Sequence, residues 1–331
     1  MKQSIIYFLK RIFVLTLLIS IISYLYSTFL YEKTMKDEGW LKKIGSESFS
    51  KKAEILYFSA SPNSSYPETD TDRRSIHEKI QSYISSYKIE ALDTGAIHAG
   101  IFLHALKELP KEYKPKIVLM DLNLRSFGKL WIHSPLENSL QRNLIYWNNN
   151  LGLYNRLKAA LKSYPYIPNH EREALINFDE KFEKLPFTDS CLTIKRWTDS
   201  LNHRLDHYDG IGREMVRNFG FKIKPDNEML QFYNQIVSFC NANHIQLIFL
   251  VLPENYEGME KNTGKNLKLL CQQNVFFLKQ HFNKIPIIDL SNKLNATYFY
   301  ETFPTEHYNS EGREIVAKKV GQFINQIQHG N

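Results

Sequence analysis

Three polar residues with complementary chemistry stand just after apolar segments of this 331-residue chain. Ser61 ends the segment ILYFSAS, Asn123 ends VLMDLN, and His307 lies in PTEHYNSEGREIVA, after a further apolar run that contains Asp289. A serine hydroxyl becomes a nucleophile when a histidine removes its proton. An asparagine amide can donate to the negative oxygen that forms on an attacked carbonyl. If these segments converge, their residue types predict acyl transfer through a serine.

The spacing of apolar residues predicts the elements that would bring these segments together. Short apolar runs alternate with helical patterns, which is typical of βαβ units and a parallel sheet. We expect five strands, at residues 53–59, 88–92, 116–122, 245–252 and 285–290. Ligands of open parallel sheets bind beyond the carboxyl ends of the strands. The sequence therefore predicts a three-layer α/β/α sandwich of flavodoxin-like type, with a five-stranded, mainly parallel sheet and a site at that edge.

Two helices are expected to complete the sandwich. Over residues 226–243, helical spacing places four apolar residues on one face, and Asp226 after Pro225 is a plausible N-cap. The last helix is expected to begin at Ser310, and its apolar stripe consists of Val316, Val320, Phe323 and Ile327.

An uncharged apolar run from Ile12 to Tyr31 predicts a transmembrane signal-anchor. A helix of this length covers roughly the 30 Å hydrocarbon core of a bilayer. Lys2, Lys10 and Arg11 precede it without an acid, so the positive-inside rule places residues 1–11 in the cytoplasm and the rest of the chain outside. A cleaved signal peptide is the alternative, but its apolar region should be about 7–15 residues long and end in small residues.

The remaining chain is expected to form one domain behind a stalk. Residues 32–50 are rich in charge and predict the stalk, and residues 51–331 predict the α/β domain. Within it, residues 128–224 have helical spacing but no convincing parallel strand. This region predicts a mostly helical insertion, which at a strand end would help to shape a substrate site.

Composition excludes several classes of protein. With 43% apolar residues, 14 Gly and 12 Pro, the chain is neither disordered nor collagen-like. The net charge is +7, but residues 1–11 supply three of these charges, and basic residues elsewhere alternate with acids. We therefore expect a bilayer partner through residues 12–31 and no nucleic acid.

The histidines and cysteines do not predict a metal site. His203 and His207 are spaced i, i+4 beside two aspartates, but they lack a clear third ligand. The three cysteines have neither the spacing nor the neighbours of a zinc site. No Walker A lysine motif or Gly-x-Ser-x-Gly elbow is present. No metal and no cofactor are expected.

With these segments the chain resembles the SGNH (GDSL-like) hydrolase superfamily, in its membrane-anchored branch of bacterial envelope acyl-transfer proteins. The resemblance spans about residues 53–327 apart from the insertion. ILYFSAS takes the place of the first block, a strand that ends in Gly-Asp-Ser, so Ser61 matches the nucleophile. VLMDLN matches the third block, which makes Asn123 an oxyanion donor. PTEHYNSEGREIVA matches the last block, Asp-x-x-His before the C-terminal helix, which makes His307 the general base.

The chain also departs from the family pattern. Ser59 and Ala60 replace the Gly and Asp of the first block, and Pro304 stands where the family has the Asp that orients the imidazole. Glu306 would be the orienting acid, with Glu301 or a main-chain carbonyl as alternatives.

The other groups of the expected site are less closely specified by the motifs. In LDTGAIHAG, Gly95 is the nearest match to the oxyanion glycine of the second block, with His98 and Gly100 as rivals. Asn123 could instead cap the end of its strand. Arg125, in the same loop, could bind an anionic or sugar group of a substrate, or form an ion pair with an acid.

The resemblance implies an extracytoplasmic serine esterase or O-acyltransferase that modifies carbohydrate of the bacterial envelope or an exported polysaccharide through an acyl-serine. It implies a single-pass protein of the inner membrane, with the catalytic domain periplasmic or extracellular. A multispanning membrane O-acyltransferase is an implied partner. The alternatives are a catalytically degenerate SGNH domain that binds glycan or scaffolds an acylation complex, and a simple deacetylase.

Overall fold

The computed structural model describes residues 2–30, 39–128, 210–300 and 305–329, with a few single positions between 131 and 147. The chain divides into two compact units. One contains residues 1–46 and 137–165, and the other contains residues 47–136 and 166–331.

Five parallel strands form the centre of the second unit and confirm the predicted sheet. They are β1 (Ile55–Ser59), β2 (Ile89–Asp93), β3 (Ile117–Asp121), β4 (Gln246–Val251) and β5 (Ile287–Asp289). Their order is β2-β1-β3-β4-β5. The central strands are buried on both faces, which explains their nearly continuous apolar sequences. The strand order reverses between β1 and β3, where doubly wound sheets form their ligand crevice.

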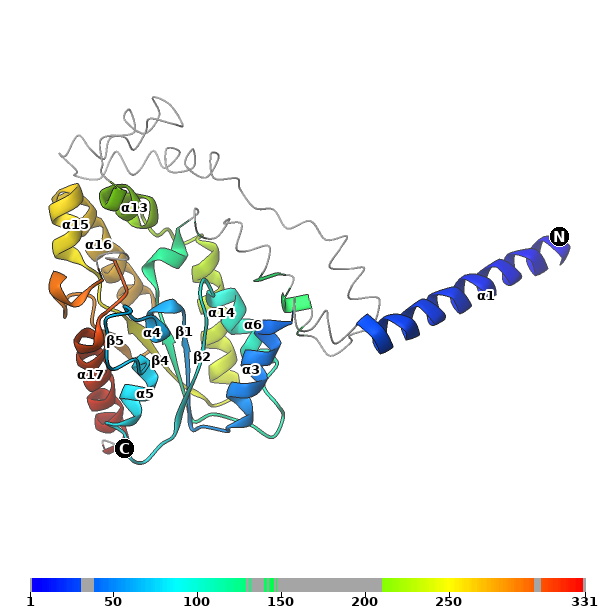
Figure 1. The fold of residues 1–331 in the computed structure, drawn as a ribbon, viewed down its shortest axis with the longest axis horizontal. Coiled ribbons are helices and arrows are strands. Elements are labelled where there is room, and N and C mark those ends of the chain that lie inside the picture. Colours follow the sequence, from blue (N-terminus) through cyan, green and yellow to red (C-terminus); the bar gives the residue numbers. More distant parts are fainter. Residues whose placement is uncertain are drawn as a thin grey trace, which may run out of the picture. The chain divides into compact units, whose positions relative to one another are not determined.

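Helices cover both faces of this sheet, as the sequence predicts. On one face α5 (Ile76–Gln81) packs against α17 (Ser310–His329), and on the other α6 (Ala99–Lys107) packs against α14 (Glu228–Ala242) (Figure 1). Three further helices are α13 (Gly210–Phe219), α15 (Tyr256–Thr263) and α16 (Lys265–His281), and α15 packs against both of the others.

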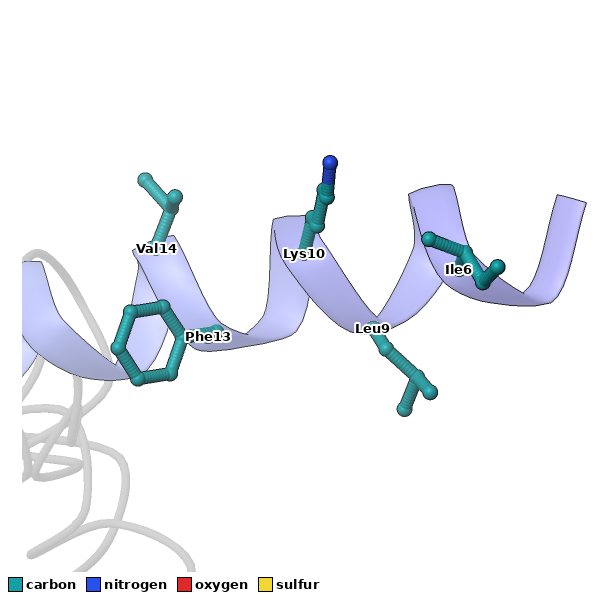
Figure 2. A pocket seen from close by; sticks show the side chains of 5 residues that line it. All are labelled: Ile6, Leu9, Lys10, Phe13 and Val14. Carbon is teal, nitrogen blue, oxygen red and sulfur yellow. The ribbon is translucent and has the colours of Figure 1, made fainter. Parts of the chain in front are cut away.

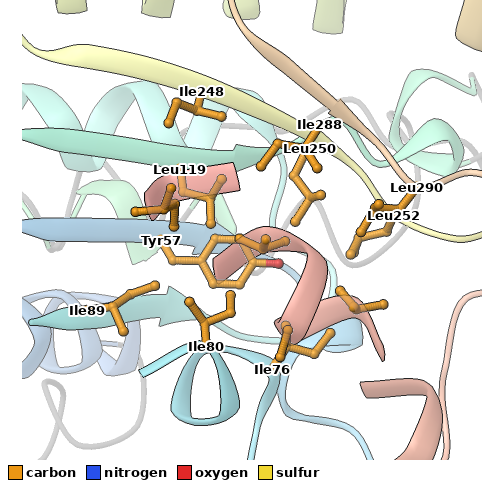
Figure 3. Packing of buried hydrophobic residues seen from close by; sticks show 14 of the residues in the cluster. Tyr57, Ile76, Ile80, Ile89, Leu119, Ile248, Leu250, Leu252, Ile288 and Leu290 are labelled. Carbon is orange, nitrogen blue, oxygen red and sulfur yellow. The ribbon is translucent and has the colours of Figure 1, made fainter. Parts of the chain in front are cut away.

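Alternate strand residues supply the core on each side of the sheet. One cluster joins the strands to the apolar stripes of α5 and α17, and Figure 3 shows its packing around Tyr57, Leu119, Leu250, Ile76 and Ile80. The predicted stripe of the last helix is confirmed, because Val316 and Val320 are buried in this cluster. On the opposite side, the rings of Phe58 and Phe102 lie 5.4 Å apart. Buried apolar area on both faces therefore stabilises the layers that position the strand ends.

The N-cap predicted for α14 is wrong by one residue. Asn227, not Asp226, caps the helix, because its side chain accepts hydrogen bonds from the main-chain N–H groups of Met229 and Leu230. Asn227 also donates to the carbonyl of Phe127 at 2.8 Å, which ties the start of α14 to the loop after β3. Asp226 makes neither bond, since it lies one residue too early.

The segment expected to be a stalk is partly helical. Trp40–Ser50 form helix α3, and the hydroxyl of Ser48 donates to the carbonyl of Ala91 at 2.7 Å, so the end of α3 packs on the sheet domain. Residues 31–38 lie outside the described part. Of the expected insertion at residues 128–224, α13 is a helix, whereas residues 148–209 lie outside it.

A long apolar helix begins the chain. α1 (Lys2–Leu25) continues into a π-helical turn, η1 (Tyr26–Leu30), and Ser4–Leu30 is long and apolar enough to cross a membrane, with mean hydropathy 2.3. Lys10 and Arg11 lie within α1. An open hollow on its surface is lined by Ile6, Leu9, Lys10, Phe13 and Val14 (Figure 2). All five residues belong to one helix, so this hollow is not a cavity of the sheet domain.

Candidate active site

The structure brings Ser61 and His307 into contact although they are 246 positions apart in the sequence. Ser61 Oγ and His307 Nε2 lie 3.0 Å apart, a hydrogen-bond distance. Ser61 begins the one-turn helix α4 (Ser61–Ser64), two residues beyond the end of β1. His307 stands three residues before α17. The arrangement has the geometry of a nucleophile beside its base.

The short helix that carries Ser61 is fastened through its third residue. Asn63 is fully buried, and its side-chain oxygen accepts from the main-chain N–H of His77 at 2.9 Å. The amide nitrogen of Asn63 lies 3.0 Å from Nδ1 of His77, which also contacts Ser75 Oγ at 2.8 Å. Because α4 has only one turn and no side-chain N-cap, these bonds to α5 fix its position.

The segment that carries His307 is fixed by its neighbours. Tyr308 is fully buried, and its hydroxyl donates to the carbonyl of Pro253 at 2.9 Å. The main-chain N–H of Tyr300 donates to the carbonyl of His307, and the two rings lie 5.6 Å apart. These contacts leave His307 with 6% of its surface exposed and its Nε2 facing Ser61.

The surroundings of His307 favour the neutral imidazole. Burial lowers its pKa below the ordinary value, the charge of Glu306 opposes this effect, and the charge of Arg125 adds to it. A neutral imidazole can accept the proton of the Ser61 hydroxyl, whereas a protonated one cannot.

Glu306, the expected orienting acid, forms a buried ion pair with Arg125. Only 2% of Glu306 is exposed, and its Oε1 lies 2.5 Å from Nη2 of Arg125. The guanidinium also lies over the ring of Trp131, 4.1 Å from the ring centre. The ion pair expected for Arg125 as one of two roles is thus present, and its binding of a substrate group stays a prediction.

A second buried acid, Glu254, belongs to the same cluster and was missed by the sequence analysis. It follows β4, and only 4% of it is exposed. Burial raises the pKa of Glu254 well above its ordinary value, the charge of Glu306 raises it further, and Arg125 opposes both effects. The protonated form of Glu254 is thus favoured, and the guanidinium charge is balanced by Glu306. A glutamate two positions after the apolar run that ends at Leu252 is the available sequence signal.

Asn123 and Ser61 follow the carboxyl ends of two paired strands, β3 and β1. Phe58 of β1 pairs with Met120 of β3, and Ser61 and Asn123 each lie three residues further on. Asn123 caps the 3-10 helix η2 (Leu124–Phe127), since its Oδ1 accepts from the main-chain N–H of Arg125 at 3.0 Å. This cap uses the oxygen of the amide. The amide NH₂, which an oxyanion would need, is not consumed by it.

A buried carboxyl joins the two strands below this pair. Asp121 at the end of β3 accepts hydrogen bonds from the hydroxyls of Ser59 and Tyr57 of β1. Its main-chain carbonyl accepts from Tyr233 at 2.6 Å. Burial raises the pKa of Asp121 to about 7. These bonds fix the strand ends from which Ser61 and Asn123 extend.

The glycine and histidine considered for a second oxyanion donor lie between β2 and α6. Gly95 is in an exposed turn, and a side chain added there would meet no atom within 4 Å. His98 is the N-cap of α6, and its Nδ1 accepts from the main-chain N–H of Gly100 at 3.1 Å. No neighbouring atom therefore lies so close to Gly95 that only a glycine would fit there.

Within the described residues, no group of three His, Cys, Asp or Glu side chains could hold a metal ion. His203, His207, Glu301 and Pro304 lie outside those residues.

Comparison with known proteins found no matching family model and no matching curated relative. Among solved structures, the chain is similar to a GDSL-like lipase from Bacteroides thetaiotaomicron, with 11% identity, a TM-score of 0.38, and coverage of 87% of this chain and 98% of that one. It is also similar to LAE5, an α/β hydrolase from the metagenome of Lake Arreo, with 7% identity, a TM-score of 0.35, and coverage of 80% and 92%. At such TM-scores these similarities carry no functional argument.

Proposed function

We propose that this chain is a membrane-anchored serine esterase or O-acyltransferase of the SGNH type, acting through an acyl-serine on Ser61. The observation that carries the proposal is the 3.0 Å contact between Ser61 Oγ and His307 Nε2 at the carboxyl edge of the sheet. Burial, which lowers the pKa of His307, and the place of Asn123 just after the strand that pairs with β1 support it.

In the proposed mechanism, His307 Nε2 takes the hydroxyl proton of Ser61 while Oγ attacks an ester carbonyl. The oxygen that becomes negative is held by the amide of Asn123 and by main-chain N–H groups near Ser61. Loss of one such donor typically slows the reaction about 100- to 1,000-fold. Protonated His307 then gives its proton to the leaving alcohol, and an acyl-serine remains.

The second half of the reaction decides between hydrolysis and transfer. His307 removes a proton from water in an esterase and from a sugar hydroxyl in a transferase, and that oxygen then attacks the acyl-serine. The Glu306–Arg125 pair is proposed to act on His307 electrostatically, because Glu306 is the acid whose charge raises the pKa of His307.

The proposed setting is the outer side of the bacterial inner membrane. The apolar helix Ser4–Leu30 supports an anchor, and the basic residues near its start support a cytoplasmic N-terminus. The carbohydrate acceptor and a multispanning membrane O-acyltransferase as partner rest on the resemblance to the envelope acyl-transfer branch.

Fluorophosphonate labelling of the full-length protein in detergent tests this proposal, because the reagent reacts with activated serines. The wild-type chain should be labelled, whereas Ser61→Ala should abolish the label and His307→Ala should reduce it by at least about 100-fold. Ser64→Ala is the matched control, since Ser64 is an exposed serine of the same short helix. Label on the wild type that persists in Ser61→Ala would contradict the proposal.

The alternative is a catalytically degenerate domain that binds glycan or scaffolds an acylation complex. The engagement of the Glu306 carboxylate by Arg125 favours it, because that carboxylate is then not dedicated to the imidazole. No labelling of the wild type and no hydrolysis of an activated acetate ester, together with binding of a polysaccharide, would support this alternative. Where the wild type is active, release of acetate to water identifies a deacetylase, and acetylated sugar identifies a transferase.

A further inference from the structure

A single buried guanidinium joins the segment after Ser61 to the segment after His307. Arg313 lies in the first turns of α17 and is 0% exposed. Its Nη1 donates to the carbonyl of Tyr308 at 2.8 Å, which holds the residue next to His307. Its Nη2 donates to the carbonyl of Asp72 at 2.6 Å and its Nε to that of Arg74 at 3.1 Å, in the loop that leads from α4 to α5.

The same guanidinium also reaches the end of the helix that Ser61 begins. Nη1 of Arg313 lies 3.5 Å from the carbonyl of Ser65, the C-cap of α4, and 2.9 Å from Oδ2 of Asp70. The main-chain N–H of Ser65 in turn donates to the carbonyl of Ser61 at 2.9 Å. Arg313 is thus linked through Ser65 to Ser61 and through Tyr308 to His307.

These contacts need an arginine. A guanidinium presents N–H groups in several fixed directions, so it can donate to carbonyls from different segments at once. A lysine ammonium is a compact charge with three donors and could keep the pair with Asp70, but it could not reproduce the spread of bonds. The loop carbonyls would lose the donors that the fully buried guanidinium of Arg313 supplies.

We propose that Arg313 is a positioning residue that sets the contact between Ser61 and His307 by clamping the residue 65–74 loop to the start of α17. This inference rests on the proposed function of that pair. Arg313 acts through main-chain groups and does not itself touch the reacting atoms.

The chain offers a matched control in Lys79 of α5. Lys79 is also buried, and its ammonium lies 2.5 Å from Asp72 Oδ2 and 3.0 Å from Glu314 Oε2. It therefore ties the same loop to the same helix, but through side chains that do not lead to Ser65 or Tyr308. A purely structural role for Arg313 predicts similar consequences for Arg313→Lys and Lys79→Met.

The test compares Arg313→Lys, Lys79→Met and wild type as full-length proteins in detergent, each below its melting temperature. We expect Arg313→Lys to lower the rate of fluorophosphonate labelling and the kcat for an activated acetate ester about 100-fold, as a misplacement of about 1 Å can do, with KM little changed. The labelling rate and the kcat of Lys79→Met should stay within about threefold of the wild-type values, even where its Tm falls as far as that of Arg313→Lys.

A second variant and a second measurement keep the inference testable if Arg313→Lys folds poorly. Asp70→Asn removes only the charged partner, so a smaller loss of labelling is expected. Hydrogen–deuterium exchange at residues 61–75 should rise in both Arg313→Lys and Asp70→Asn but not in Lys79→Met. Two results would overturn the inference while leaving the proposed function intact. In the first, the loss of labelling follows the loss of Tm in the same proportion in every variant. In the second, Asp70→Asn and Arg313→Lys are labelled at the wild-type rate. An unlabelled wild type would instead overturn the proposed function, and this inference with it.

Discussion

At the scale of single residues, the environment of His307 sets the pH at which Ser61 can be activated. Burial and the charge of Arg125 lower the pKa of the imidazole, and the charge of Glu306 raises it. Glu254 lies in the same cluster, and burial and the charge of Glu306 raise its pKa. The raised pKa favours the protonated form of Glu254, so this residue does not add a second full negative charge beside His307. The site therefore combines a neutral base with a single buried ion pair.

A pH–rate profile tests this balance. Because the folded protein lowers the pKa of His307, the acid limb of labelling or of kcat/KM should have an apparent pKa below 6.5. Glu306→Gln removes the charge that raises this pKa, so the limb should move further toward acid pH. Glu311→Gln, at an exposed site in the first turn of α17, should leave the limb in place. A limb above pH 6.5 in the wild type, or an upward shift in Glu306→Gln, would contradict this account.

At the scale of the elements, helix caps and strand ends determine where the polar groups lie. Asn227 caps α14 and donates to the carbonyl of Phe127. This bond holds the start of α14 beside the loop that carries Asn123 and Arg125. The ends of β1 and β3 are joined by Asp121 with Ser59 and Tyr57. In both cases, the side chain of one residue forms a hydrogen bond to a group of a neighbouring element.

The cap of α14 can be tested by a pair of neighbouring substitutions. Asn227→Ala removes the bonds to Met229 and Leu230 and the bond to Phe127, so it should lower the free energy of unfolding by about 1–2 kcal/mol. Asp226→Ala should change it by less than about 0.5 kcal/mol. Urea unfolding of the two variants measures the difference, and an equal loss in both would speak against Asn227 as the cap.

The sheet and the contact between Ser61 and His307 could be predicted because they depend on strong local patterns. Strands buried on both faces give nearly continuous apolar runs, and the ends of such runs locate the carboxyl edge of the sheet. Asn227 could not be distinguished from Asp226, because both are good caps and helix starts are ambiguous by a residue.

The buried charged residues were harder to find. Glu254 and Arg313 have residue types that are mostly exposed, and only the fold reveals that partners from distant segments surround them. A signal did exist for Arg313, which falls on the same helical stripe as Val316 and Val320 and so had to face the core. The partner of Glu306 was equally hidden, since Arg125 is 181 positions earlier in the sequence.

At the scale of the whole molecule, the sequence combines an apolar helix of membrane-spanning length with an α/β sheet domain. Most large apolar side chains of Ser4–Leu30 are exposed, although Tyr26 is buried, whereas the sheet domain buries its own between α5, α17, α6 and α14. A lipid environment is the solvent that such a helix requires.

The orientation of the proposed anchor can be measured with single added cysteines. Lys2→Cys should react with a membrane-impermeant maleimide only after cells are opened, because the basic end is expected in the cytoplasm. Lys111→Cys, at an exposed position of the sheet domain, should react once the outer face of the inner membrane is accessible. Cys240 and Cys271 are buried, and the parent chain gives the background. The reverse pattern would place the domain in the cytoplasm.

The order of the strands also has a consequence for biosynthesis. β5 is an edge strand, three strand spacings or roughly 14 Å from β1, so the chain must return across the sheet after Asp289 before His307 can meet Ser61. His307 is 246 positions after Ser61 in the sequence. A ribosome that adds roughly 5–20 residues per second must therefore make all of the intervening chain before His307 exists. The nascent chain carries a serine without a partner, and the pair is assembled only when the last helix docks.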